Sequence, residues 1–268
     1  MGLVELETLG RELVGTALSA GASLAGIAPA DELKRSPSHA VFGVLDSFTG
    51  VGTKAAGEIA RGEVRWPEQA RSMLILAVEH PEDEPQLDWW IEGLSGGTRG
   101  NRKLMDVADA AASWAAEKGI SVVKLPYHIE HGGIFLKDAA VLGGLGCIGK
   151  NNLLVTPQYG PRVRLRAVAL GADLPATGPI DFDPCDGCAE PCRKVCPQSA
   201  FAARKHDAER LGQTRLPGRT GVYDRQTCNI QMELDVANHA SIVSDEKGET
   251  ARLVRYCREC ELACPAGR

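Results

Sequence analysis

The chain has 268 residues and a mass of 28.5 kDa; 44% of the residues are hydrophobic and 24% are charged. This composition predicts a globular protein with one substantial core. Its 30 Lys and Arg residues against 35 Asp and Glu residues give a formal charge of −5, which argues against a long polyanion as partner. No apolar run approaches the roughly 20 residues of a membrane span. The N-terminal segment also lacks the basic start of a signal peptide, so we expect a cytoplasmic protein without membrane contact.

Hydrophobic periodicity predicts helices and strands that intermingle along the first 175 residues. In the second helix, Asn101 is a candidate cap and Gly119 a candidate stop. The mixture predicts one α/β or α+β core. The expected helices are 3–19, 101–118 and 135–144, and the expected strands are 72–80, 121–127 and 162–170.

The nine cysteines are unevenly distributed. Only Cys147 precedes residue 180, and the other eight lie between Cys185 and Cys264. The segment 171–184 is rich in Gly, Pro and Asp, which marks a boundary. We therefore expect a core domain over 1–178 and a cysteine-rich domain over 179–268. A disulfide scaffold would be short and secreted, so metal or redox chemistry is the better explanation of these cysteines.

The eight clustered cysteines form two runs similar to the bacterial ferredoxin pattern. The first run is Cys185-x2-Cys188-x3-Cys192-x3-Cys196-Pro197; the second is Cys257-x2-Cys260-x3-Cys264-Pro265, and Cys228 lies between them. In two-cluster ferredoxins the last cysteine of a run ligates the other cluster. This rule predicts two 4Fe–4S clusters, and the alternative is two structural zinc sites, because C-x2-C pairs also build zinc ribbons. The predicted ligand sets are Cys185, Cys188, Cys192 and Cys264 (the Cys185 set) and Cys196, Cys228, Cys257 and Cys260 (the Cys196 set).

A dense group of glycines precedes the cysteine runs. Glycines over 143–149 allow the backbone to approach something large and flat, and the residues that follow offer hydrogen-bond donors. The G-x-G-x-x-G spacing of a dinucleotide site occurs at Gly144, Gly146 and Gly149, but it follows a helix-like segment instead of a strand. A nicotinamide or flavin site and a purely structural loop are the alternatives to another cofactor site.

The stretch AVLGGLGCIGKNNLLVTPQYGPRVRL and the double cysteine run together resemble the cobalamin-dependent iron–sulfur reductases typified by epoxyqueuosine reductase. Their catalytic core is related to that of reductive dehalogenases. The resemblance extends from residue 72 to Pro265. It implies an α+β fold, with a nitroreductase-like cobalamin-binding core and a C-terminal ferredoxin-like domain holding two 4Fe–4S clusters, the Cys185 set nearest the cobalamin. The residues that it assigns to cobalamin are Gly146, Cys147, Ile148, Gly149, Lys150, Asn151, Asn152 and Tyr159.

The chain departs from this family in three places. Cys147 stands where the family commonly has Trp, and it either faces the cofactor or packs as a small buried residue. The family's catalytic aspartate falls in the stretch 128–131, so Glu130 and then His131 are the expected proton donors, with a solvated polar turn as the alternative. The family continues into a helical-repeat region that helps to hold tRNA, whereas this sequence ends three residues after Pro265. We therefore do not expect tRNA as the substrate.

The resemblance predicts an oxidoreductase that passes electrons from two 4Fe–4S clusters to the cobalt of cobalamin and on to an unidentified substrate. One alternative is an electron-transfer activator or carrier that reduces the corrinoid of a partner protein. Another is a plain ferredoxin-like relay. The expected partners are a low-potential electron donor of the ferredoxin or flavodoxin type and, as substrate, a small molecule or a corrinoid protein.

Overall fold

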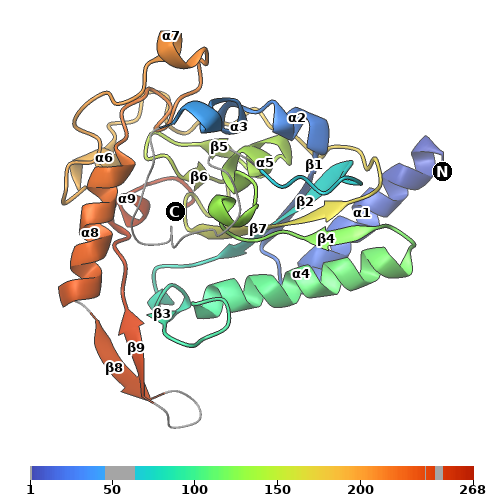
Figure 1. The fold of residues 1–268 in the computed structure, drawn as a ribbon, viewed down its shortest axis with the longest axis horizontal. Coiled ribbons are helices and arrows are strands. Elements are labelled where there is room, and N and C mark those ends of the chain that lie inside the picture. Colours follow the sequence, from blue (N-terminus) through green and yellow to red (C-terminus); the bar gives the residue numbers. More distant parts are fainter. Residues whose placement is uncertain (1, 46–63, 239, 245–249) are drawn as a thin grey trace.

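A four-stranded antiparallel sheet forms the centre of the protein, with the strand order β1–β2–β7–β4 (Figure 1). The structure is a computed structural model that describes residues 2–45, 64–238, 240–244 and 250–268, apart from the side chains of Glu130 and Ser244. The strands of this sheet are β1 (Leu24–Pro29), β2 (Ser72–Glu79), β7 (Val163–Leu170) and β4 (Val122–Lys124).

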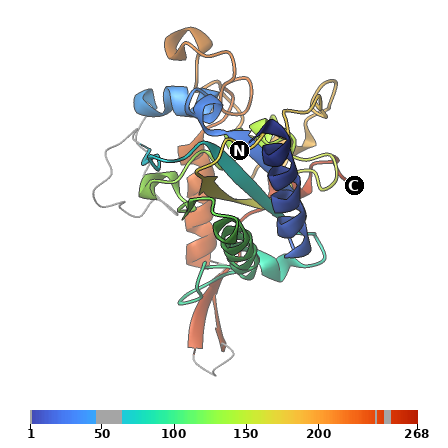
Figure 2. The same ribbon diagram turned by 90° about the vertical axis from the view of Figure 1, so that its right-hand side faces the viewer.

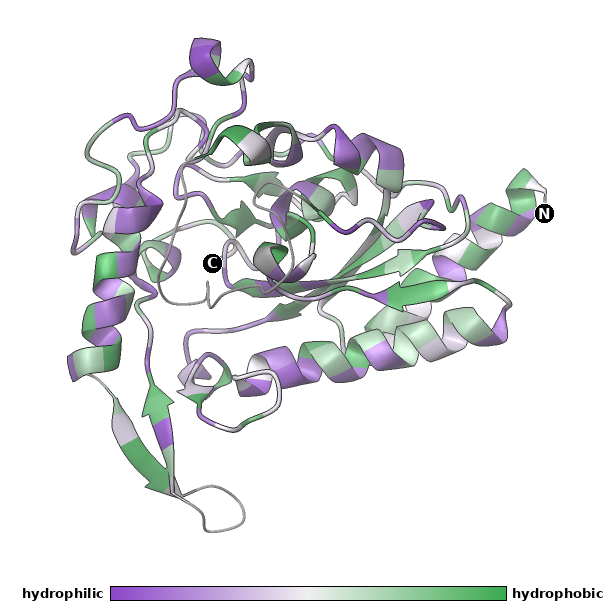
Figure 3. Ribbon diagram, viewed as in Figure 1, coloured by the Kyte–Doolittle hydropathy of each residue, from purple (hydrophilic) through white to green (hydrophobic). Residues whose placement is uncertain are grey.

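Helices pack on both faces of this sheet (Figure 2). Because side chains of a strand alternate between faces, β2 contributes to two cores. Leu74 and Leu76 pack with helices α1 (Leu3–Ser19) and α4 (Arg99–Glu117) on one side. Met73 and Ile75 pack with helix α5 (Leu136–Leu142) on the other. The hydropathy colouring shows this arrangement as apolar strands between amphipathic helices (Figure 3).

The six elements expected from periodicity are all present. Helix α1 has the predicted bounds, whereas α4 begins earlier because Thr98, and not Asn101, is its cap: the Thr98 hydroxyl accepts the Asn101 N–H at 3.0 Å. The strand expected over 121–127 is only the short edge strand β4. Strand β1 was not predicted; at its Gly26 a Cβ would lie 2.1 Å from the Gly143 carbonyl oxygen, so glycine permits the contact with the end of α5.

The cysteine-rich segment adds short helices and a hairpin that projects from the body (Figure 1). Strand β3 pairs with β9, with Trp90 opposite Val254, so hydrogen bonding crosses the boundary expected near residue 178. Among the described residues, no helix has the length and apolar character needed to cross a bilayer. The remaining elements are α2 (Ala30–Lys34), α3 (Pro37–Val41), η1 (Phe42–Val44), η2 (Pro85–Leu87), β3 (Trp90–Ile91), η3 (Ile129–His131), β5 (Cys147–Ile148), β6 (Leu154–Val155), α6 (Pro191–Lys194), α7 (Ala208–Leu211), α8 (Arg225–Asn238), β8 (Ser241–Ser244), β9 (Thr250–Val254) and α9 (Glu259–Leu262).

A charge network centred on Asp88 joins the core to the second cysteine run. The Asp88 carboxylate contacts the guanidinium of Arg164 from β7 at 2.8 Å and that of Arg258 at 2.7 Å. Glu261 contacts the same two arginines, at 2.8 and 2.5 Å. His80 is fully buried, and its Nδ1 is 2.7 Å from Asp88. Burial lowers the pKa of His80, so the ring is neutral and donates to the carboxylate.

Replacing Asp88 with alanine should lower the free energy of unfolding by about 3 kcal/mol, because it leaves buried arginines without their carboxylate. Desolvation opposes ionisation, but the His80 hydrogen bond and both guanidinium charges hold the pKa of Asp88 below its ordinary value. The contribution is therefore present at neutral pH and is lost as the pH falls through the folded-state pKa. Urea denaturation followed by far-UV circular dichroism measures it.

The control is Asp31→Ala, which removes an exposed i,i+3 pair with Lys34. It should leave the free energy of unfolding nearly unchanged, because an exposed ion pair contributes little to stability. Equal losses in the two variants would show that the Asp88 network adds no more than a surface ion pair.

Candidate functional site

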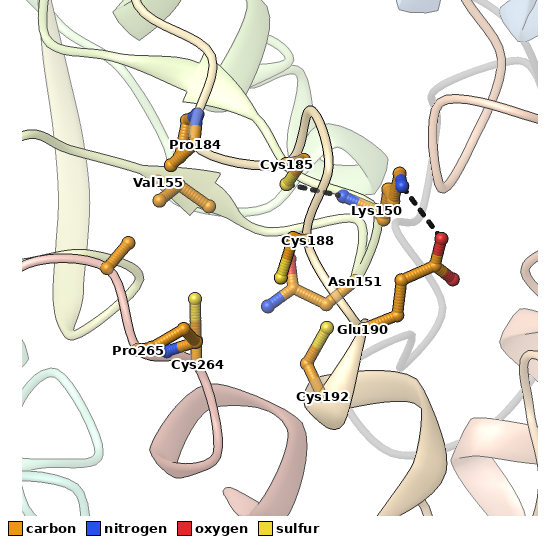
Figure 4. Close-up of a pocket in the computed structure, with 11 residues that line it drawn as sticks. Lys150, Asn151, Val155, Pro184, Cys185, Cys188, Glu190, Cys192, Cys264 and Pro265 are labelled. Atoms are coloured by element: carbon orange, nitrogen blue, oxygen red, sulfur yellow. Dashed lines mark hydrogen bonds and ion pairs between the residues drawn. The ribbon is translucent and has the colours of Figure 1, made fainter.

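The Cys185 set surrounds one cavity. Its four cysteines line a space of about 180 Å³ together with Lys150, Asn151, Glu190 and Pro265 (Figure 4). Cys185, Cys192 and Cys264 are buried. Cys264 comes from the second run, so the fold unites three cysteines of the first run with one that lies 72 residues beyond Cys192 in the sequence.

Short turns and a helix present the first-run thiols of this set. The Asp183 carboxylate accepts the Cys185 N–H at 3.0 Å, and the Cys188 N–H donates to the Cys185 carbonyl at 3.4 Å. Cys192 lies on α6, which begins directly after Glu190 in a left-handed conformation. The turn over 184–187 and helix α6 thus bring the three thiols to one cavity.

The β5–β6 hairpin closes the same cavity from the core side. The Lys150 N–H donates to the Cys185 sulfur at 3.5 Å, and the Lys150 ammonium pairs with Glu190 at 2.7 Å. At Gly149 a Cβ would lie 3.6 Å from the Cys185 sulfur and 2.7 Å from a Val155 methyl carbon. Glycine is therefore needed where this loop meets the cysteine turn.

The Cys196 set lines a second and larger cavity, of about 530 Å³. Cys228 lies on α8, Cys260 lies on α9, and Cys257 precedes α9. The Ala200 N–H donates to the Cys196 sulfur at 3.3 Å. Core side chains form the opposite wall, so this set opens into the α/β core and does not have a cavity of its own.

Burial and mutual proximity make Cys192 and Cys260 hard to ionise. Burial, and after it the neighbouring Cys264 and Cys185, raise the pKa of Cys192 to about 11. Burial also raises the pKa of Cys260, and Cys228, Cys257 and Cys196 act in the same direction. A bound cationic metal centre reverses this preference, because thiolates are the ligating form.

The core wall of the larger cavity combines apolar side chains with a buried cation. Burial lowers the pKa of Lys137 to about 8, and its ammonium donates to the Asn152 carbonyl at 2.5 Å. Asn152 has a positive φ of 60° and accepts the Gly218 N–H at 3.1 Å through its side chain. Sequence analysis did not single out Lys137; its place in a helical apolar stretch concealed that it faces the cavity. The apolar members of this wall are Ile134, Phe135, Leu136, Leu153, Leu154, Val163 and Leu165.

Asn151 belongs to both cavities. Its side chain is 3% exposed, its amide donates to the Cys260 carbonyl at 3.3 Å, and its Oδ1 accepts the Leu153 N–H at 3.2 Å. One side chain of the glycine-rich loop thus separates the two cysteine sets and bonds to the backbone of the Cys196 set.

The other residues expected at a cofactor lie further from the larger cavity. Cys147 and Ile148 form β5, and burial raises the pKa of the Cys147 thiol to about 11. Gly146 packs on the backbone of β6, where a Cβ would lie 2.1 Å from the Val155 oxygen. Tyr159 packs against the hydrophobic core. Of the expected loop residues, Asn151 and Asn152 line the larger cavity.

The stretch 128–131 forms the short helix η3 and the residue before it. His128 and Ile129 line the larger cavity, whereas the His131 side chain is exposed and lines neither cavity. The His128 and His131 rings lie 5.6 Å apart. The side chain of Glu130 lies outside the described part of the structure. His128, which we did not select from the sequence, is thus the histidine placed at the cavity.

Sequence comparison finds two reductases. An epoxyqueuosine reductase of Lactococcus garvieae is 25% identical over 211 residues, which cover 74% of this chain and 52% of the relative. A tetrachloroethene reductive dehalogenase of Sulfurospirillum multivorans is 28% identical over 129 residues, which cover 47% of this chain and 22% of the relative. The chain thus spans about half the length of the first relative and about a fifth of the second. No family model matches the chain.

Comparison of folds finds the same two groups. Epoxyqueuosine reductase from Streptococcus thermophilus superposes with a TM-score of 0.56 and 18% identity, covering 96% of this chain and 66% of that one. A catabolic reductive dehalogenase in complex with 3-bromo-4-hydroxybenzoic acid gives a TM-score of 0.60 and 17% identity, covering 98% and 33%. The chain is therefore homologous to epoxyqueuosine reductase and to reductive dehalogenase, and it has their mixed α/β fold.

Proposed function

We propose that this protein is a cobalamin-dependent reductase that carries two 4Fe–4S clusters. The observation that carries the proposal is the sorting of eight cysteines into two sets, each drawn from both runs, with one set on the wall of the core cavity. Homology to two kinds of reductase supports an oxidoreductase. As substrate we propose a small molecule, which the larger cavity of about 530 Å³ could admit.

The donor sets fit iron–sulfur clusters. A structural zinc ion draws its sulfur ligands to about 2.3 Å, whereas the Cys185 set surrounds one cavity and the Cys196 set lines one wall of another. The backbone N–H groups of Lys150 and Ala200 donate to sulfur, and hydrogen bonds of this kind tune the potentials of iron–sulfur clusters. We assign one cluster to the Cys185 set and the other to the Cys196 set.

The side chains that line the larger cavity match the chemistry of a corrinoid. It combines an apolar wall with amide and ammonium groups, which suit a macrocycle that carries amide side chains. Asn152 and Lys137 would hold the cofactor, and Gly146 and Gly149 would act by shaping the loop. Bound cobalamin supplies a cobalt centre that accepts electrons and delivers them to a carbon–oxygen or carbon–halogen bond.

We also propose that the Cys196 set lies nearest the substrate cavity, which reverses the order expected from the resemblance. Its thiols line the same cavity as His128 and Lys137, whereas the Cys185 set lines a separate space beyond Asn151. A low-potential donor of the ferredoxin or flavodoxin type would then approach the Cys185 set. We take residues 1–178 as the cofactor-binding part and 179–268 as the cluster-binding part.

Anaerobic reconstitution with iron and sulfide should give about eight iron atoms per chain, because eight cysteines match two cubane clusters. Cys188→Ala and Cys196→Ala should each lose about half of this iron, and each should remove a different EPR signal. The reason is that these two cysteines belong to one run but to different sets. Cys147→Ala, the matched control, should keep all the iron. Loss of the same EPR signal in both variants would contradict the assignment.

We expect His128→Asn to lower the rate of substrate reduction by about 100-fold, as loss of a general acid does. The assay uses a halogenated phenol or an alkyl epoxide as acceptor, Ti(III) citrate as reductant and no partner protein. His131→Asn should change the rate less than about threefold, because its side chain is exposed. Glu130→Gln is measured in the same assay, because the sequence also made Glu130 a candidate proton donor.

An equal loss in His131→Asn would contradict the assignment of His128. Stoichiometric corrinoid without turnover of either acceptor would instead favour the activator or carrier function, and absence of corrinoid binding would favour the relay.

A further inference from the structure

We propose that two buried charges, Arg162 and Asp235, set the reduction potentials of the two clusters apart. Arg162 raises the potential of the cluster in the Cys185 set, and Asp235 lowers that of the cluster in the Cys196 set. This inference rests on the proposed function, because it requires a cluster at each set. It concerns the protein's own charges around the clusters.

Arg162 places a positive charge beside Cys264. Its side chain is 6% exposed and donates to the carbonyl oxygens of Cys264 at 3.4 Å, Ala266 at 2.9 Å and Gly267 at 2.7 Å. These acceptors are neutral, and no ion pair of the described residues includes Arg162. The full charge of a buried guanidinium therefore acts at the Cys185 set.

Asp235 places a negative charge beside Cys257. Its side chain is 4% exposed and accepts the Cys257 N–H at 2.7 Å and the Gln231 amide at 2.8 Å. Both donors are neutral, and Asp235 joins no ion pair in the parts of the chain that the structure describes.

The other charges near the two sets are of both signs. At the Cys196 set, the Asp88 network contains two carboxylates and two guanidinium groups. Lys137 and Arg225 line the same cavity and place positive charge there, which opposes Asp235. At the Cys185 set, Asp183 pairs with Arg219, Glu190 is shared by Lys150 and Arg193, and Asp186 lies between Cys185 and Cys188 in the sequence. The contributions of Arg162 and Asp235 are therefore measured by removing each charge separately.

Reduction adds one electron to a cluster, so a nearby positive charge stabilises the reduced state and a negative charge destabilises it. The effect is larger in the interior than in water, because the surroundings screen the charge less. The charge of Arg162 therefore favours the reduced state of the Cys185-set cluster. The charge of Asp235 disfavours the reduced state of the Cys196-set cluster, which lines the substrate cavity, and so makes that cluster a stronger reductant.

The test is an EPR-monitored titration of the reconstituted protein with dithionite. Cys188→Ala and Cys228→Ala assign each signal to its set. Asp235→Asn removes the charge but keeps an acceptor for the Cys257 N–H. At a fixed potential it should raise the reduced-to-oxidised ratio of the Cys196-set cluster about tenfold, which is +59 mV for one electron. The Cys185-set cluster should not change.

Arg162→Gln is the mirror experiment. It should lower the reduced-to-oxidised ratio of the Cys185-set cluster about tenfold and leave the other cluster unchanged. Asp235→Glu and Arg162→Lys keep the charge. Each should shift the midpoint potential of its cluster less than Asp235→Asn or Arg162→Gln does.

Unchanged midpoints, or shifts that fall on the opposite cluster, would overturn the inference. Loss of iron from its own set in Asp235→Asn or Arg162→Gln would also overturn it for that residue, because the side chain would then anchor the set and not tune it. A wild-type protein that forms fewer than two clusters would instead refute the proposed function, so the two failures are distinguishable.

Discussion

The ion network around Asp88 is the interaction on which both cysteine sets depend. Arg258 lies between Cys257 and Cys260, and Glu261 follows directly, so the contacts of Asp88 and Arg164 fix this part of the second run against β2 and β7. Each set contains at least one cysteine of the second run. The sorting of the cysteines is therefore determined by charge pairing with the core as much as by the local turns.

The buried charges fall into two kinds that differ in their partners. The carboxylates and guanidinium groups around Asp88 occur in equal number, so their desolvation is offset by mutual attraction. Arg162 and Asp235 have only dipoles as partners. Buried charges of this second kind lower the stability of the fold. Each of the two lies beside a cysteine set, where its field acts on the thiols. This contrast distinguishes the structural charges of the protein from those assigned to tuning.

Periodicity and spacing predicted much of this molecule, but not the contacts between distant segments. The main helices and strands follow from apolar patterns, and the proposed division of the cysteines into two sets follows from a spacing rule. Strand β1 escaped prediction because it is short and contains Gly26, and the pairing of β3 with β9 has no local signal. Choosing between His128 and His131 required the exposure of each side chain, which neighbours from other segments determine.

The glycine-rich loop shapes the site mainly through its packing, and only part of it lines the larger cavity. Its glycines permit close packing against β6 and Cys185, and this packing places Asn151 between the two cavities. There the buried amide donates to the Cys260 carbonyl, while the adjacent Lys150 N–H donates to the Cys185 sulfur. Two consecutive residues thus contact both cysteine sets at once. The loop therefore fixes the spacing between the two cysteine sets. In the proposed function electrons pass between the sets, so this spacing would constrain the loop even where it does not touch the larger cavity.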